Sequence, residues 1–450
     1  MRCRSRAFSS ASSAAASLSS SSRDIMAVLS RISEPIPPEI LDTCLQSHLD
    51  DHETLLVAAL VCRDWAPVAQ RVLLKSIKFN QSNMIAYDRA VTLLAELLEE
   101  KPELIPFIRE VEFLWSHRWL TIFFERIELS SVTSFTLKEM SYLQIPAEDL
   151  QAERRLVKLP SMTTVDLTGC TFEDVRQLTA LLGECGLNVK KLKLHRVCLL
   201  RHRYPAFKRD NRFNLITDSH GYPIEDEERF PPPIKLDPFA GECAKLEKLE
   251  LVRGASVLLA AWLIWDSSPF DLTGLKTLRY EEDGHERYNA RDDEQRFRIQ
   301  SDRAAVTTIL EKCASTLEHL EMYAARSVSE GDEIDISPKA LPNLKTLTIA
   351  GLCPDSIKTA IRWVTSLTSE NRIHHLTLKV SFGSLAVRKD ATQSWADLDN
   401  ALDDLNLPFL RGIDVKIPRK HNQSDEDVEK RLKKYFPRIS GRESCKLVVL

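Results

Sequence analysis

Residues 246–251 read LEKLEL: an apolar residue, two polar residues, a second apolar residue, a polar residue and a third apolar residue. The pattern apolar-x-x-apolar-x-apolar recurs along the chain, and its ten copies begin at Ile108, Val132, Met162, Val189, Leu246, Leu275, Leu317, Leu344, Ile373 and Leu410. Alternation of apolar and polar residues is typical of a strand that buries one face. Each copy therefore predicts a short strand.

The spacing of these copies indicates a structural repeat. Successive copies begin 24, 30, 27, 57, 29, 42, 27, 29 and 37 residues apart. A loose pattern of this kind also arises by chance in an apolar-rich chain, so the spacing carries the inference. Most intervals lie in or near the range of about 20 to 29 residues that is typical of leucine-rich repeats. The interval of 57 residues is close to two periods, with a polar insertion where one repeat would stand.

The stretches between the predicted strands include segments with helical periodicity. Residues 172–186, 305–314 and 356–368 carry apolar side chains at spacings of three and four, and each follows a copy of the strand pattern. Such spacing places the apolar side chains on one face of a helix. We therefore expect these helices to cover the inward side chains of the strands.

Residues 105–450 resemble leucine-rich-repeat-like domains. The resemblance implies an α/β fold, an irregular solenoid of short parallel strands and helices. Two features depart from the family pattern: the Asn or Cys that closes the repeat is mostly missing, although Cys170 falls near such a position, and the repeat lengths vary. These departures leave the number of repeats and the curvature open.

The outward side chains of the strands are the candidate binding residues, because the strand face of a solenoid is its usual binding surface. We predict a protein-substrate site at Lys193, His195, Glu250, Arg279, Glu321 and Tyr323, with further outward positions at Glu281, Thr348, Thr377, Lys379, Asp414 and Lys416. The set is mixed in charge, whereas nucleic acid calls for a clustered basic stripe. The alternative for each residue is an ordinary solvated strand face.

The N-terminal part of the chain has a different sequence pattern. From Ile36 the sequence reads IPPEILDTCLQSHLDDHETLLVAALVCRDWAPVAQRVLLKSIKF. Pro38 suits the first turn of a helix, and Leu41, Leu45 and Leu49 repeat at four-residue spacing to make one apolar stripe. Two more short helices are expected after the break at Asp50. A segment this short struggles to bury a core of its own, so it requires a partner.

This segment, over residues 34–78, resembles the F-box. The resemblance implies three helices that dock on a Skp-family adaptor, which links them to a cullin-RING ubiquitin ligase. It places Pro37, Ile40, Leu41, Leu45, Leu56, Val61, Cys62 and Trp65 on or behind the adaptor-binding surface. Ile36 stands where the family usually has Leu. The alternative is a helical cap that forms part of the next domain.

The remaining N-terminal residues form a separate segment, predicted to be a disordered tail over residues 1–30. The first 25 residues are rich in Ser, Ala and Arg and contain no acidic residue before Asp24. This composition fits a mitochondrial transit peptide, a disordered tail, or upstream sequence preceding a start at Met26. Residues 79–104 are predicted to form a linker helix. The F-box resemblance implies a cytoplasmic or nuclear location, and a mitochondrial one if the tail is a transit peptide.

Composition and motifs favour a binding protein over an enzyme. The 450 residues include 43% hydrophobic and 28% charged residues, with a formal net charge of -4, which gives no reason to expect nucleic acid or a membrane surface as a partner. The longest apolar run, residues 255–265, is too short to span a bilayer. The ten cysteines are scattered singly and are interpreted as buried thiols. The chain contains no GxGxxG, GxxxxGK[ST], GxSxG or HExxH motif, so we expect no cofactor, metal or catalytic residue.

The sequence thus predicts the substrate-receptor subunit of an SCF-type (Skp-cullin-F-box) ubiquitin ligase. The F-box would bind the adaptor and the repeat domain an unidentified protein substrate. A leucine-rich-repeat scaffold acting outside ubiquitination is the alternative. An enzyme with its site in the repeat region is a third interpretation, which the lack of these catalytic motifs does not favour.

Overall fold

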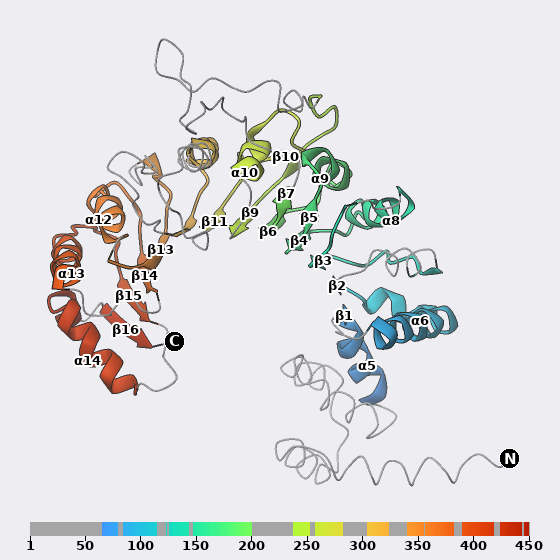
Figure 1. Ribbon diagram of the computed structural model, residues 1–450, viewed down its shortest axis with the longest axis horizontal. Helices are drawn as coiled ribbons and strands as arrows, with labels where there is room; N and C mark the ends of the chain where they lie inside the picture. The colour runs from blue at the N-terminus through green and yellow to red at the C-terminus, as the bar shows by residue number, and fades with distance from the viewer. Residues whose placement is uncertain are drawn as a thin grey trace, which may run out of the picture. The chain divides into compact units, whose positions relative to one another are not determined.

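The computed structural model describes residues 65–79, 84–114, 123, 126–143, 147–199, 237–252, 257–281, 304–323, 340–354, 356–381, 389–417, 424–442 and 445–449. The chain is mixed α/β, and its described part contains a large, mostly parallel sheet of twelve strands (Figure 1). Two compact units share the chain: residues 1–112 with 123–133, and residues 113–122 with 134–450. The predicted tail and the predicted F-box up to residue 64 lie outside the described residues.

The first unit is helical at its described start. Its elements are α5 (Trp65–Lys75), β1 (Ser76–Phe79), α6 (Met84–Glu100), the 3-10 helix η2 (Pro102–Phe107) and most of β2 (Glu110–Leu114). On α6 the buried residues Val91, Ala95 and Leu98 follow helical spacing. The guanidinium of Arg71 on α5 lies 5.4 Å from the centre of the Phe107 ring, a cation–π contact between α5 and η2.

The second unit alternates strands with helices. Its sheet strands are β3 (Ser134–Lys138), β4 (Thr164–Thr168), β6 (Lys191–His195), β9 (Lys248–Val252), β11 (Thr277–Glu281), β12 (His319–Tyr323), β13 (Thr346–Leu352), β14 (His375–Val380), β15 (Gly412–Ile417) and β16 (Cys445–Val449). Its helices are α8 (Ala147–Val157), α9 (Val175–Leu182), α10 (Val257–Ile264), α12 (Ile357–Thr365), α13 (Lys389–Asp403), α14 (Asp425–Tyr435) and the 3-10 helix η4 (Ile439–Gly441), with a further helical segment over residues 304–313. Two small parallel pairs, β5 (Thr171–Phe172) with β7 (Cys198–Leu199) and β8 (Ala244–Lys245) with β10 (Phe270–Asp271), stand beside the sheet.

The strand order of this unit follows the chain. From β3 to β16 each sheet strand pairs with the next one in sequence, and every one of these pairs is parallel. Strand β6 pairs directly with β9, so no sheet strand stands between them despite the long interval in sequence. Parallel neighbours need crossover connections, and a described helix lies in seven of the nine. The connections from β6 to β9 and from β12 to β13 run largely outside the described residues.

Every copy of the strand pattern forms a strand, and each of these strands begins two residues into its copy, as Leu246 and Lys248 illustrate. The leading apolar residue is buried in all copies except the last, where Leu410 is half-buried. Two sheet strands were not predicted. Before β16, Arg442 stands where the leading apolar residue belongs, and β1 lies in a stretch that was assigned to the F-box.

The helices of the second unit lie together on one side of its curved sheet, as Figure 1 shows from α8 round to α14. The three predicted helical stretches are confirmed as α9, residues 304–313 and α12. Helix α9 begins where Asp174 accepts hydrogen bonds from the backbone N–H of Arg176 (2.8 Å) and Gln177 (3.2 Å), a side-chain cap on its first turn.

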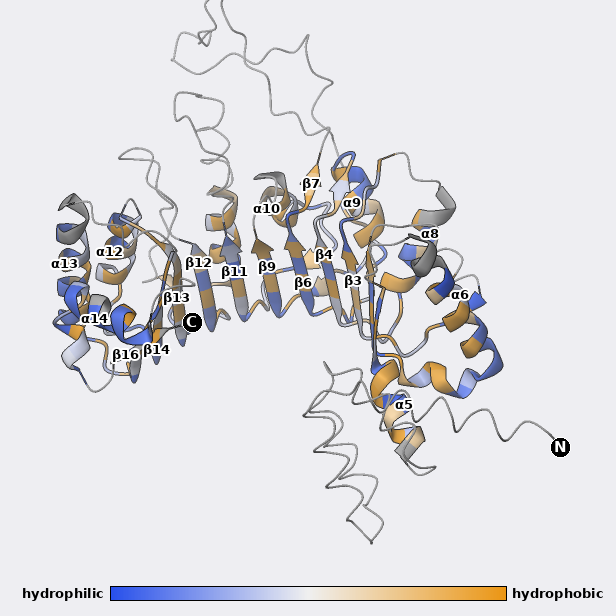
Figure 2. Ribbon diagram, turned by 60° about the horizontal axis from the view of Figure 1, so that its bottom comes forward, coloured by the Kyte–Doolittle hydropathy of each residue, from blue (hydrophilic) through white to orange (hydrophobic). Residues whose placement is uncertain are grey.

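The core of the second unit lies between its sheet and its helices. Inward positions of neighbouring strands form continuous apolar rows, one of which contains Leu192, Leu249, Leu278, Leu320, Leu347 and Leu376, all buried. Burial of each such side chain contributes about 1.5 to 3 kcal/mol before entropy is counted. The strands in Figure 2 therefore carry alternating hydrophobic and hydrophilic bands. The hydrophilic bands mark the face turned away from the core.

Candidate protein-binding face

The outward side chains of the second unit's sheet strands, β3 to β16, lie on one face of the sheet. We call it the polar face. All six predicted substrate-site residues lie on it: Lys193 and His195 on β6, Glu250 on β9, Arg279 on β11, and Glu321 and Tyr323 on β12. No described helix of this unit covers the polar face in Figure 1. The alternation in sequence was therefore sufficient to place these residues together.

The strand register aligns five charged residues of alternating sign across the polar face. Asp166 pairs with Lys193, Lys193 with Glu250, Glu250 with Arg279, and Arg279 with Glu321. We call these five residues the charged row. Directly opposed residues of opposite charge stabilise adjacent strands, so the row supports the register from β4 to β12.

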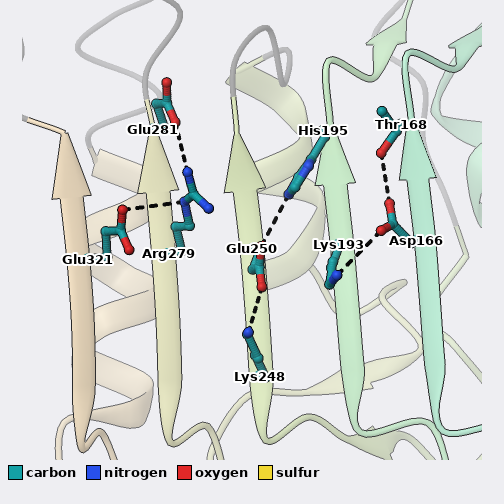
Figure 3. Close-up of polar contacts among 9 residues, drawn as sticks. All are labelled: Asp166, Thr168, Lys193, His195, Lys248, Glu250, Arg279, Glu281 and Glu321. Atoms are coloured by element: carbon teal, nitrogen blue, oxygen red, sulfur yellow. Dashed lines mark hydrogen bonds and ion pairs between the residues drawn. The ribbon is translucent and has the colours of Figure 1, made fainter. Parts of the chain in front are cut away.

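At the β4 end of the charged row, Asp166 is held from two sides. The hydroxyl of Thr168 donates a hydrogen bond to its Oδ1 at 2.8 Å, and Lys193 Nζ lies 3.5 Å from its Oδ2 (Figure 3). The carboxylate is thereby fixed beside the lysine. Asp166 and Thr168 were not among the predicted site residues, although Asp166 occupies the same place in its copy of the strand pattern as Lys193, Glu250, Arg279 and Glu321.

Glu250 is the most enclosed carboxylate of the row. Lys248 Nζ lies 2.7 Å from its Oε1, and His195 Nε2 lies 3.3 Å from its Oε2 without the alignment of a good hydrogen bond (Figure 3). The nearby His195 ring and then Lys248 lower the pKa of Glu250 to about 2, against the desolvation that would raise it. Glu250 is therefore a permanent negative charge at neutral pH.

Arg279 lies between two carboxylates. Its Nη2 donates a hydrogen bond to Glu281 Oε2 at 3.4 Å, and its Nε lies 3.6 Å from Glu321 Oε1 (Figure 3). Lys379 Nζ approaches the same oxygen of Glu321 to 2.7 Å from strand β14. These contacts join strands β11, β12 and β14 on the polar face.

Tyr323 lies beside the charged row and closes against the backbone of β13. Gly351 on that strand has a φ of +71°, and the register shifts between Ile349 and Leu352, which marks a β-bulge. A Cβ on Gly351 would collide with the Tyr323 ring, so the ring needs a glycine at this position. The Tyr323 hydroxyl lies 3.4 Å from Ser381 Oγ. The ring is thus held over the bulge.

Cations outnumber carboxylates on the polar face. In the described strands β3 to β16, outward positions hold eight lysine or arginine residues, Lys138, Lys191, Lys193, Lys248, Arg279, Lys379, Lys416 and Lys446, and five carboxylates, Asp166, Glu250, Glu281, Glu321 and Asp414. The whole chain has a formal net charge of -4. The polar face is therefore opposite in sign to the chain that carries it.

Among the described residues, no three His, Cys, Asp or Glu side chains are placed together to hold a metal ion. Burial raises the pKa of the thiols of Cys170, Cys185 and Cys313 to about 12, which keeps them protonated and unreactive. Within the described part of the chain, none of the helices combines the length and apolar character that a membrane span requires.

The predicted adaptor-binding residues fall at the edge of the described structure. Pro37, Ile40, Leu41, Leu45, Leu56, Val61 and Cys62 lie outside the described residues, and Trp65 is the first residue of α5. Their role stays a prediction from sequence.

No protein-family model matches the chain, and no curated protein is significantly similar to it in sequence.

Proposed function

We propose that this chain is the substrate-receptor subunit of an SCF-type ubiquitin ligase. Residues 34–78 bind a Skp-family adaptor as an F-box, and the polar face binds a protein substrate. The observation that carries the proposal is the succession along the chain: an F-box-like order of residues from Ile36 to Trp65, followed by a long parallel sheet with one face uncovered by described helices.

The finer fold assignment belongs to the same proposal. We assign residues 105–450 to an irregular leucine-rich-repeat-like solenoid. Three observations support it: the regular spacing of the strand pattern, the pairing of each sheet strand with the next, and the helices gathered on the opposite side of the sheet. The interval between Val189 and Leu246 lacks one repeat, and β6 and β9 close the gap by pairing directly.

The proposed mechanism is proximity. A substrate held on the polar face and an adaptor held by residues 34–78 become parts of one complex, which raises the effective concentration of substrate lysines near the ubiquitin-charged enzyme. The receptor contributes binding energy and no catalytic group.

The test is a pull-down of the full chain with purified Skp-family adaptor. The double change Pro37→Ala and Leu41→Ala removes two apolar contacts of the proposed adaptor surface, and we expect it to abolish capture. The double change Leu187→Ala and Pro408→Ala is the matched control, since both residues are exposed on the second unit. Capture that survives the first change, or no capture by the unchanged chain, contradicts the receptor role and favours a repeat scaffold that acts outside ubiquitination.

A further inference from the structure

The charges on the polar face are layered, with the acids beneath the bases. Exposed side-chain fractions are 15% for Asp166, 9% for Glu250 and 25% for Glu321, against 31% for Lys193, 38% for Lys248, 37% for Arg279 and 37% for Lys379. In each ion pair among these residues the carboxylate is the less exposed partner. Solvent therefore meets the cations first.

The layering determines what the polar face offers to a partner. A lysine ammonium carries three N–H donors and an arginine guanidinium five, and a carboxylate carries none. The carboxylates, which are less exposed than the cations, already accept hydrogen bonds from Thr168 and Arg279 and form ion pairs with Lys193, Lys248 and Lys379. They therefore position the cations. Donors that remain on the cations point to a partner rich in acceptors.

The excess of cations on the polar face indicates that the partner is negatively charged. The polar face has more cations than carboxylates, whereas the chain as a whole is negative. A local field opposite to that of the rest of the molecule directs an anionic partner to this surface and away from others.

The interleaving of carboxylates indicates the class of anion. Glu250 separates Lys193 from Arg279 within the charged row, and Glu321 lies between Arg279 and Lys379. A polymer with a phosphate at every unit would place negative charge against these carboxylates, whereas nucleic-acid sites are continuous basic stripes. Lys193 and Arg279 are two strands, or about 9.6 Å, apart, with Glu250 between them. An extended polypeptide with an acidic side chain at about every third residue, a spacing of about 9 to 10 Å, can match these cations and place neutral residues against the carboxylate.

We propose that the polar face recognises an extended, acidic segment of a protein, bound across the strands from β4 to β14 through Lys193, Arg279 and Lys379. The inference rests on the proposed use of this face for substrate. Seven strands at a spacing of about 4.8 Å span about 29 Å, which an extended chain at about 3.3 Å per residue crosses in about nine residues.

The experiment measures fluorescence anisotropy of a labelled peptide of about nine residues, with Glu at every third position and Ser at the others, with the full chain. Peptides with Gln or Lys in place of Glu and a single-stranded DNA of equal length are the comparison probes. We expect binding of the Glu peptide that weakens as salt rises, and at least about tenfold weaker binding of the Gln and Lys peptides and of the DNA. Equal binding of the Gln peptide, or tighter binding of the DNA or the Lys peptide, overturns the proposal.

Two triple variants test whether the Glu peptide binds on the polar face. Changing Lys193, Arg279 and Lys379 to Gln removes three positive charges from the polar face, and we expect at least about a tenfold loss of Glu-peptide affinity. Changing Lys158, Lys358 and Lys433 to Gln removes the same charge from exposed positions off this face, and affinity should stay within about twofold. Equal losses in the two variants overturn the assignment.

A charge-conserving variant is the control for loss of affinity caused by misfolding. Lys193→Arg, Arg279→Lys and Lys379→Arg together keep the charges above the same carboxylates, and this variant should retain most of the affinity. Loss of affinity there, with an unchanged melting curve, would contradict recognition by charge. The adaptor pull-down depends on residues 34–78, so failure of the receptor role and failure of the acidic-segment proposal give separate results.

Discussion

Lys379 on β14 forms an ion pair with Glu321 on β12, with its Nζ 2.7 Å from Oε1, and strand β13 lies between the two. The in-register residue of β13 beside Glu321 is Thr348, whose short side chain leaves room for the longer ones to meet above it. On the other side of Glu321, Arg279 Nε on β11 lies 3.6 Å from the same Oε1. One carboxylate thereby connects side chains of three strands.

The energy of this pair is expected to be small but measurable. A double-mutant cycle with Lys379→Met and Glu321→Gln, followed by urea unfolding, should give a coupling of about 0.5 to 1 kcal/mol, because both side chains are partly exposed and screened by solvent. The same cycle at Lys433 and Glu429 on α14, a more exposed pair, should give about 0.3 kcal/mol. A coupling no larger than that of the α14 pair would contradict the contact across β13.

Glu250 should make stability depend on pH in the acid range. Its pKa in the folded chain, about 2, lies below the ordinary value of 4.5, so the unfolded chain takes up the proton first as pH falls. The stabilisation is complete above about pH 4.5 and is lost as pH falls toward 2, with an upper limit of about 3 kcal/mol. Urea unfolding of the Glu250→Gln variant should therefore differ most from the unchanged chain at neutral pH. Glu242→Gln, at an exposed position, is the control variant.

Gly351 should tolerate no side chain. Gly351→Ala places a Cβ at positive φ and against the Tyr323 ring, and we expect a loss of about 2 to 4 kcal/mol in unfolding free energy. Gly441→Ala is the control, because a Cβ there meets nothing within 4 Å. Adding Tyr323→Ala to Gly351→Ala should recover the steric part of the loss. No recovery would show that the ring does not cause it.

Asp399 should anchor the C-terminal part of the second unit. It is 1% exposed and accepts hydrogen bonds from the backbone N–H of Arg438 (2.9 Å) and Ile439 (3.1 Å), which join α13 to the start of η4. Asp399→Ala leaves two donors without this acceptor and should cost about 1 to 3 kcal/mol in thermal or urea unfolding. Asp404→Ala, at an exposed position just after the end of α13, should cost less than about 0.5 kcal/mol. Equal costs for the two changes would contradict the anchoring role.

The strands of the second unit could be predicted from sequence because their two faces differ so strongly. A one-residue shift would turn Leu249 outward and Glu250 into the core, so the alternation alone determines which side each residue takes. Strand β16 escaped prediction because Arg442 stands where the pattern requires an apolar residue. From β3 to β15, the membership of the polar face was thus predictable residue by residue, whereas Lys446 on β16 was not.

The contacts within the polar face could not be predicted in the same way. Which cation meets which carboxylate depends on strand order and register, and the sequence between Val189 and Leu246 left room for another repeat. The direct pairing of β6 with β9 is what brings His195 and Lys193 beside Glu250. The contact of Lys379 with Glu321 reaches across strand β13, so neither residue's place in its own strand pattern predicts it.

The direct pairing of β6 and β9 also bears on how such a chain can vary. Neighbouring strands meet in register whether the connection between them is short or long, so the length of a connection is free to change while the charged row stays in place. A foreign sequence grafted between Leu199 and Asp237 would then leave Lys193 opposite Glu250. New recognition elements can be added to this architecture one connection at a time, without redesign of the sheet that holds them.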